Sequence, residues 1–188
     1  MAGTKNNRRT LYTKQVIHEA FFQLLAEKDF AKITITGICQ KAALNRGTFY
    51  SHYADPQALF TEIQEELFQE IKPLLAFNQQ PDFKSWLIKL LTLLQKNEPA
   101  ARLILRDYPN SQLLKRLFAE VYDLACANFQ QLFQEDDPEV LDYYFTYFVT
   151  GTIGTVNEWL TRGCPLTVEK LAELLSKAIN NAYPSSSN

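Results

Sequence analysis

Eight prolines divide the 188 residues and limit where regular structure can continue. Proline lacks a backbone N–H and clashes with the preceding helical turn, so it rarely lies inside a helix. Between the prolines, apolar residues recur every three or four positions, which is the spacing of one face of an α-helix. The sequence therefore predicts an all-α fold of about nine helices. The expected helices cover residues 10–28, 35–42, 46–52, 56–77 with a kink or an end at Pro73, 82–94, 99–106, 111–133, 138–160 and 167–179.

Helix starts are marked by residues whose side chains accept hydrogen bonds from free backbone N–H groups. Thr10 is the expected cap of the first helix, and either Thr34 or Thr36 caps the second. Asn45 precedes the third, and Asp55 followed by proline opens the fourth. Short second and third helices between two longer ones predict a helix-turn-helix.

Composition excludes several classes of protein. With 46% hydrophobic and 21% charged residues the chain can form a core, as one large domain or two small ones. The first residues, MAGTKNNRR, contain no apolar stretch, so we expect a soluble, cytoplasmic protein. Three distant cysteines and two histidines predict neither a disulfide framework nor a metal site. Dinucleotide, Walker, HExxH and GxSxG motifs are absent, so we expect no enzyme activity and no cofactor.

Charge is distributed unevenly along the chain. Residues 1–53 hold eight Lys or Arg against three acids, although the net charge of the whole chain is −2. The remaining residues are therefore acidic in balance. A polyanion such as DNA would be attracted to the first part and repelled by the second.

Residues 34–53 carry the chemistry that a DNA-binding helix-turn-helix requires. Threonine, serine and tyrosine hydroxyls bind phosphate oxygens, and the fork of Arg46 can read a guanine. Gly47 permits close approach of the backbone. On the inner side we expect a small core formed by Ile38, Ala42, Leu44, Phe49 and Tyr53.

The segment ITITGICQKAALNRGTFYSHYADPQALF resembles the DNA-binding segment of the TetR family of transcriptional regulators. The resemblance covers about residues 10–70 and is most specific from Leu44 to Tyr50. Further along, GTIGTVNEWLTRG and the helix after it resemble the dimerisation segment of that family. The resemblance implies a DNA-binding head at residues 1–54 with a basic N-terminal arm, a helical effector-binding and dimerisation domain at 55–183, and a disordered tail at 184–188.

The resemblance implies that a homodimer binds a palindromic double-stranded operator, acts as a repressor and responds to a small apolar or aromatic effector. The expected DNA contacts are Arg8, Arg9, Lys14, Thr34, Thr36, Asn45, Arg46, Gly47, Thr48, Tyr50 and His52. Arg8, Arg9 and Lys14 also fit a solvated tail and helix face, and His52 an ordinary surface position. The sequence departs from the family pattern in two places: Ala43 replaces a turn glycine, and Asp55-Pro56-Gln57 stands where a lysine is common.

The part beyond residue 70 is rich in aromatic residues and predicts both a pocket and an interface. The expected ligand contacts are Trp86, Arg102, Tyr122, Phe129, Tyr147 and Asn157. The expected dimer contacts are Tyr144, Phe148, Gly151, Thr152, Thr155, Trp159, Leu171, Leu175 and Ala178. Two alternatives stay open: the mid-helix glycines 151 and 154 make room within one subunit, and the chain is a regulator or activator controlled by a protein partner.

Overall fold

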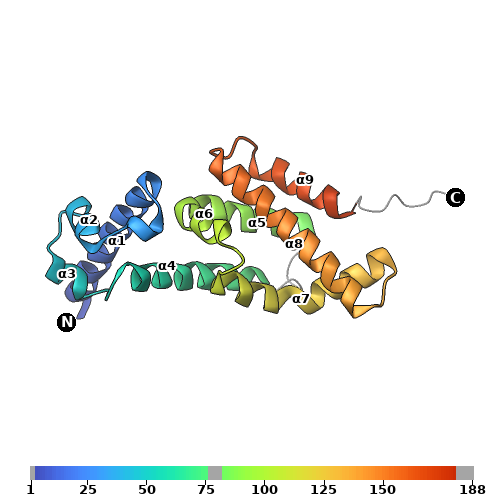
Figure 1. Cartoon of the computed structure of the whole chain (residues 1–188), viewed down its shortest axis with the longest axis horizontal. Coiled ribbons are helices and arrows are strands. Elements are labelled where there is room, and N and C mark those ends of the chain that lie inside the picture. Colours follow the sequence, from blue (N-terminus) through green and yellow to red (C-terminus); the bar gives the residue numbers. More distant parts are fainter. Residues whose placement is uncertain (1–2, 76–81, 181–188) are drawn as a thin grey trace. The chain divides into compact units, whose positions relative to one another are not determined.

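The structure, a computed structural model, describes residues 3–75 and 82–180. These residues form nine α-helices and two short 3-10 helices without a strand, which confirms the predicted all-α fold (Figure 1). In chain order they are α1 (Gly3–Glu27), η1 (Phe30–Lys32), α2 (Ile35–Lys41), α3 (Arg46–Tyr50), α4 (Pro56–Ile71), η2 (Lys72–Leu75), α5 (Phe83–Lys96), α6 (Glu98–Arg106), α7 (Gln112–Phe133), α8 (Pro138–Thr161) and α9 (Val168–Asn180). The tail expected at 184–188 lies outside the described residues.

The helix ends mostly follow the predicted caps, with one correction. α1 begins at Gly3, so Thr10 lies within the helix and is not its N-cap. The predicted basic arm at Arg8 and Arg9 is therefore helical. α4 ends at Ile71 and continues as a 3-10 turn through Pro73, because a proline disfavours the α conformation of the residue before it.

The chain divides into two compact units, Met1–Glu65 (unit 1) and Glu66–Asn188 (unit 2). The division falls inside α4, eleven residues later than the boundary expected from the sequence. The reason is the first half of α4, where Leu59, Phe60 and Ile63 are buried. The Phe60 ring lies 5.4 Å from that of Phe30, so this half of the helix belongs to the core of unit 1.

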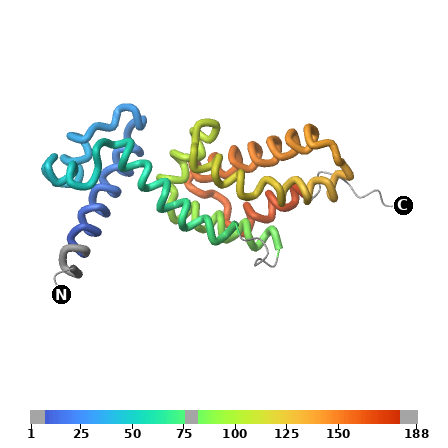
Figure 2. Tube along the Cα trace, turned by 90° about the horizontal axis from the view of Figure 1, so that it is seen from below, coloured from blue at the N-terminus to red at the C-terminus, as the bar shows by residue number. Residues whose placement is uncertain are grey.

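Unit 2 contains the second half of α4 and helices α5 to α9. α5 packs on α9, and α7 forms an antiparallel hairpin with α8 (Figure 2). Leu87 and Leu91 of α5 and Leu171 of α9 are almost completely buried. Among the described helices, none combines the length and apolar character that a membrane span requires.

The turn between α2 and α3 contains a strained alanine. Ala43 has φ 52°, in the left-handed region, where a Cβ atom costs on the order of 1 kcal/mol relative to glycine. The Leu44 N–H donates to the carbonyl of Cys39 at 2.9 Å and closes the turn. The departure from the family's glycine therefore leaves the turn conformation in place at a cost in stability.

We predict that Ala43→Gly raises the free energy of unfolding of unit 1 by up to about 1 kcal/mol, because glycine adopts positive φ without strain. The control is Ala58→Gly in the first turn of α4, where glycine should lower stability by about 0.5–1 kcal/mol. Urea unfolding monitored by circular dichroism measures both. A loss of stability in Ala43→Gly would contradict the prediction.

Candidate nucleic-acid interface

Side-chain caps fix the two short helices of unit 1. Thr34 caps α2 by accepting a hydrogen bond from the Gly37 N–H at 3.1 Å. Asn45 caps α3 in the same way, accepting from the Thr48 N–H at 2.7 Å. The Thr48 hydroxyl also donates to the side-chain amide oxygen of Asn45, Oδ1, at 3.1 Å. These bonds satisfy backbone donors that such short helices could not satisfy internally.

α3 has a buried side and an exposed side. Phe49 is fully buried, and Tyr53, just beyond the helix, is 4% exposed. On the opposite side Arg46 and Gly47 are exposed, and 52% of Tyr50 is accessible. The prediction that Tyr53 faces inward is therefore confirmed. The exposed side carries one cation, one small residue and one hydroxyl, a surface that a major groove can accept.

The remaining predicted contacts differ in their surroundings. Thr36 is exposed and His52 is half-buried. Thr34 and Asn45 each use a side-chain oxygen to accept a capping hydrogen bond. Thr48 uses its hydroxyl proton to donate to Asn45. The Asn45 amide N–H₂ and the Thr34 hydroxyl proton still have the chemistry to meet phosphate oxygens.

Lys14 is paired within its own chain. Its ammonium lies 2.7 Å from the Glu62 carboxylate, an ion pair that joins α1 to α4 within unit 1. A lysine in this position neutralises a carboxylate of its own chain, so it offers less charge to DNA than the sequence suggests, and its DNA contact stays a prediction. The sequence could not show this ion pair, because the two residues are 48 positions apart.

A partly buried polar network surrounds that ion pair. The Tyr53 hydroxyl donates to Glu62 at 2.6 Å, and the His18 Nε2 atom lies 3.1 Å from the same hydroxyl. Burial raises the pKa of the Glu62 carboxyl, but the hydrogen bonds from Lys14 and Tyr53, together with the positive charge of Lys14, hold it below its ordinary value. The network links the end of α3 to the two helices that support it.

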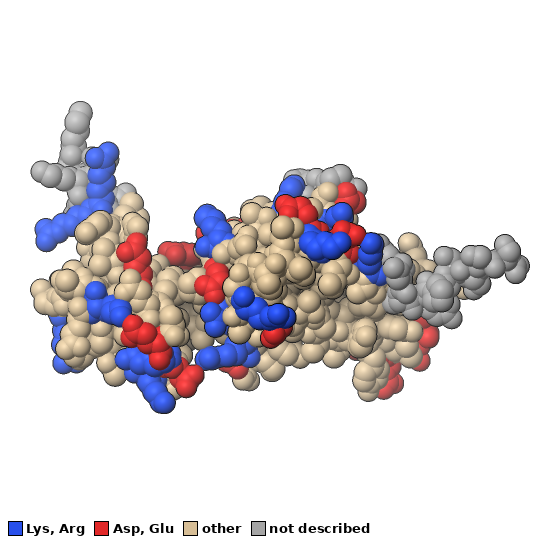
Figure 3. Space-filling view, turned by 90° about the horizontal axis from the view of Figure 1, so that it is seen from above, with Lys and Arg blue, Asp and Glu red and all other residues tan. Residues whose placement is uncertain are grey.

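Basic side chains lie around the start of α1 (Figure 3). Arg8, Arg9 and Arg46 are exposed in unit 1. Lys41, in contrast, is paired with Glu27 at 2.5 Å, and the pair lowers the pKa of that carboxyl. The cationic surface available to a polyanion is thus smaller than the sequence count suggests.

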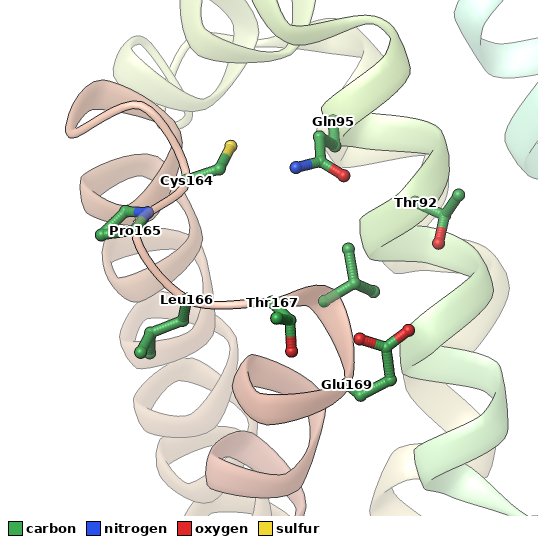
Figure 4. A pocket seen from close by; sticks show the side chains of 8 residues that line it. Thr92, Gln95, Cys164, Pro165, Leu166, Thr167 and Glu169 are labelled. Atoms are coloured by element: carbon green, nitrogen blue, oxygen red, sulfur yellow. The ribbon is translucent and has the colours of Figure 1, made fainter.

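Unit 2 contains an open groove of about 510 Å³ between α5 and the α8–α9 connection. In Figure 4, Thr92 and Gln95 on α5 face that connection from the other side of the groove. The connection contains Gly163 at φ 73° and Cys164 at φ 57°, and the Trp159 indole N–H donates to the Leu166 carbonyl at 2.8 Å. None of the six predicted ligand contacts lines this groove.

Those six residues are also dispersed over unit 2. Tyr147 is 73% exposed, and Arg102 is exposed and paired with Glu98 at 3.0 Å. The Trp86 indole N–H donates to the Leu74 carbonyl, and the Tyr122 hydroxyl donates to Asp142, which raises the pKa of Tyr122. The remaining two are Phe129, which is buried, and Asn157, which is half-buried.

Several predicted dimer contacts are used within the protomer instead. Trp159, Leu171 and Leu175 are 3%, 1% and 5% exposed. Tyr144 stacks on Phe133 of α7 at 4.2 Å, and Phe148 stacks on Phe129 at 5.2 Å. The burial of Trp159, Leu171 and Leu175 corrects their assignment as direct dimer contacts. Tyr144 and Phe148 are half-buried, and their dimer contacts stay predictions. Gly151 and Ala178 are exposed, and Thr152 and Thr155 are half-buried.

The exposed face of α8 includes two tyrosines that the sequence analysis did not assign to the dimer interface. Tyr143 and Tyr147 are 70% and 73% exposed, and Gly151 and Gly154 follow them at helical spacing. On α9, Leu174 is 46% exposed. Counting back four and eight residues from Gly151 would have found both tyrosines. We call Tyr143, Tyr147, Gly151, Gly154, Leu174 and Ala178 the α8–α9 strip.

A family model described as "Transcriptional regulator C-terminal region" (TetR_C_8) matches residues 82–181, more than half of the chain. The chain belongs to the TetR family of transcriptional regulators. This confirms the family that the helix-turn-helix segment resembled, through a match in unit 2 rather than unit 1. α3, which has an exposed side, is the helix that the sequence predicted to read DNA.

Individual relatives agree with this family. The uncharacterized HTH-type transcriptional regulator YxbF of Bacillus subtilis (strain 168) is 36% identical over 77 residues, which cover 40% of this chain and 20% of that protein. The HTH-type dhaKLM operon transcriptional activator DhaS of Lactococcus lactis subsp. lactis (strain IL1403) is 29% identical over 90 residues, covering 48% and 46%. The chain thus spans less than half the length of either relative.

Among solved structures, a TetR transcriptional regulator from Streptococcus agalactiae 2603V is similar over almost its whole length. It has a TM-score of 0.61 and 28% identity, and the match covers 93% of this chain and 97% of that one. This similarity extends the shared fold across both units.

We predict that Tyr53→Phe lowers the free energy of unfolding of unit 1 by about 1–2 kcal/mol, because Glu62 and His18 lose a buried partner. The difference should narrow as the pH falls through the depressed pKa of Glu62, because the carboxylate then becomes protonated and the hydrogen bond to it weakens. Denaturant titrations at several pH values measure this. Tyr50→Phe is the exposed control and should leave stability unchanged; equal losses in both variants would contradict the role of the network.

Proposed function

We propose that this chain is a homodimeric repressor that binds a palindromic DNA operator through α3 and responds to a small effector in unit 2. The observation that carries the proposal is the two-sided environment of α3. Phe49 and Tyr53 anchor the helix in the core, while Arg46, Gly47 and Tyr50 remain accessible. A helix held in this way can enter a major groove without losing its own packing.

Each exposed residue has a distinct role in the proposal. The Arg46 guanidinium donates to guanine O6 and N7, the pairing that its planar fork favours. At Gly47 an added Cβ would meet only the capping oxygen of Asn45, at 3.2 Å, so the glycine leaves the outer side open for DNA. Tyr50 contributes a hydroxyl to a phosphate or a base edge. Thr36 and His52 bind flanking phosphates, and Thr34, Asn45 and Thr48 position the helix ends.

The α8–α9 strip is the proposed dimer surface. At Gly151 and Gly154 an added Cβ would meet no heavy atom of the described residues within 4 Å. A mid-helix glycine costs roughly 1 kcal/mol relative to alanine, and the described part of unit 2 offers no crowding that explains it. Close approach of α8 from a second copy would explain both glycines. A dimer also presents two copies of α3 to half-sites about one helical turn apart, roughly 34–36 Å.

We predict that Gly154→Leu weakens the dimer by at least tenfold, about 1.4 kcal/mol, because its side chain enters the space reserved for the partner helix. The protomer should keep its fold, since the position is open in unit 2. Ala119→Leu on the exposed side of α7 is the matched control. Analytical ultracentrifugation over a concentration series measures the dimer dissociation constant of each variant. An unchanged constant for Gly154→Leu would exclude the α8–α9 strip as the dimer surface.

Effector control stays a prediction for unit 2. A ligand that binds more tightly to a dimer whose two α3 helices are wrongly spaced for the operator must weaken operator binding. Operator binding then weakens ligand binding by the same factor. The second candidate is an activator or a regulator controlled by a protein partner. The word "activator" in the name of DhaS and the exposed Tyr143 favour it. A metabolite that raises the melting temperature of the chain and also changes operator affinity would favour the effector over a protein partner.

We predict that Arg46→Ala weakens binding to a selected operator by about 1–3 kcal/mol and relaxes the preference for guanine at one position of each half-site. Lys96→Ala in unit 2 is the control, because Lys96 is also exposed but lies far along the chain from α3. Fluorescence anisotropy with labelled duplexes measures the affinities. If Arg46→Ala binds the operator and a scrambled duplex as the unmodified protein does, Arg46 has no part in recognition.

A further inference from the structure

The first turns of the described part of α1 lie outside the core of unit 1. From Arg8 on, where the structure describes the side chains of α1, the first buried residue is Ile17, which is fully enclosed. The preceding residues 8–16 would span about 14 Å at the rise of an α-helix. Within them Leu11 is 60% exposed and Tyr12 is 70% exposed. A helical end of this length gains little stability by itself, so a binding partner would account for its exposed large side chains.

The charge on this end is positive and confined to its beginning. Arg8 and Arg9 are exposed, and Arg8 and Tyr12 share a face at a spacing of four residues. One turn further, Gln15 donates to the carboxylate of Glu19 at 2.9 Å, so the cationic surface ends near Tyr12. We call Arg8, Arg9 and Tyr12 the α1 flank. Its charge is complementary to a phosphate backbone.

The position of the α1 flank within unit 1 fits the same partner. In Figure 1 the N-terminal half of α1 lies at the same end of the unit as α3, and in Figure 2 the blue turns of α1 extend to one side of α3. A duplex held against α3 would continue past this side. An α-helix about 10–12 Å wide cannot enter a minor groove of about 6 Å, so a helical flank contacts the backbone and not the groove floor.

We infer that the α1 flank binds the DNA backbone outside the half-site that α3 reads, with Tyr12 as a contact beside the two arginines. The inference rests on the proposed function. The arginines neutralise phosphates, the Tyr12 hydroxyl donates to a phosphate oxygen, and its ring covers the apolar face of a deoxyribose. The flank therefore lengthens the bound site without adding sequence preference.

The test uses the full chain and two duplexes with the same selected operator. One duplex ends at the outer edge of the two half-sites, and the other continues by about six base pairs of unrelated sequence at each end, roughly half a helical turn. The unmodified protein should bind the long duplex at least tenfold more tightly in 100 mM salt. With two phosphates neutralised per protomer, the slope of log affinity against log salt should steepen by about 3.6.

Variants separate the flank from the reading helix. Replacing both Arg8 and Arg9 with alanine should abolish the preference for the long duplex and leave binding to the short one unchanged. Tyr12→Ala should reduce that preference at least threefold, with Tyr12→Phe in between. The controls are Arg162→Ala and Leu124→Ala, which change exposed residues of unit 2 outside the α8–α9 strip and should keep the full preference.

The outcomes are distinguishable from a failure of the proposed function. If the unmodified protein binds neither duplex, the proposed function fails and this inference fails with it. If it binds both duplexes with equal affinity, or the double arginine variant keeps the preference for the long one, the inference is overturned while operator binding through α3 stands. Circular dichroism of each variant checks that the helical content is retained.

Discussion

The burial of Phe49 and Tyr53 beneath α3 is the constraint on which the proposed DNA-binding surface depends. A helix of five residues has too few internal hydrogen bonds to persist alone, so tertiary contacts must hold it. Phe49 supplies apolar contact, and the Tyr53 hydroxyl connects the segment to Glu62 on α4. The orientation of the exposed side of α3 is therefore set by residues that never touch DNA.

The same network places a limit on how the two ends of unit 1 can move independently. Lys14 on α1 and Glu62 on α4 form an ion pair, and Tyr53 bonds to the same carboxylate. α4 then continues into unit 2. A change in the tilt of α4 would thus be carried to α3 through a small number of polar contacts. The proposed effector control would act on α3 through these side chains.

Local chemistry was predictable from the sequence because it depends on neighbouring residues. The caps at Thr34, Asn45 and Asp55 follow from side chains that reach backbone N–H groups three residues away. The left-handed conformation of Ala43 was not predicted, because the sequence showed only that alanine replaces a glycine common in the family. The all-α fold follows from periodicity and proline positions, and the family from the segment between Leu44 and Tyr50.

Contacts between distant segments were not predictable from one sequence. The pairing of Lys14 with Glu62 and the stacking of Tyr144 on Phe133 depend on how whole helices pack. α8 carries apolar residues on most of its sides, so periodicity could not decide which side faces α7 and which is exposed. The structure therefore removes Trp159 from the proposed dimer surface and adds Tyr143 and Tyr147 beside Gly151, which the sequence had already assigned to it.

Selection of duplexes from a random library by the full chain, followed by sedimentation of the complex with the enriched sequence, tests the central claim most directly. The account predicts a motif with two-fold symmetry, half-sites about one helical turn apart and two chains on each duplex. Enrichment of no sequence, or a single chain bound to an asymmetric site, would contradict it.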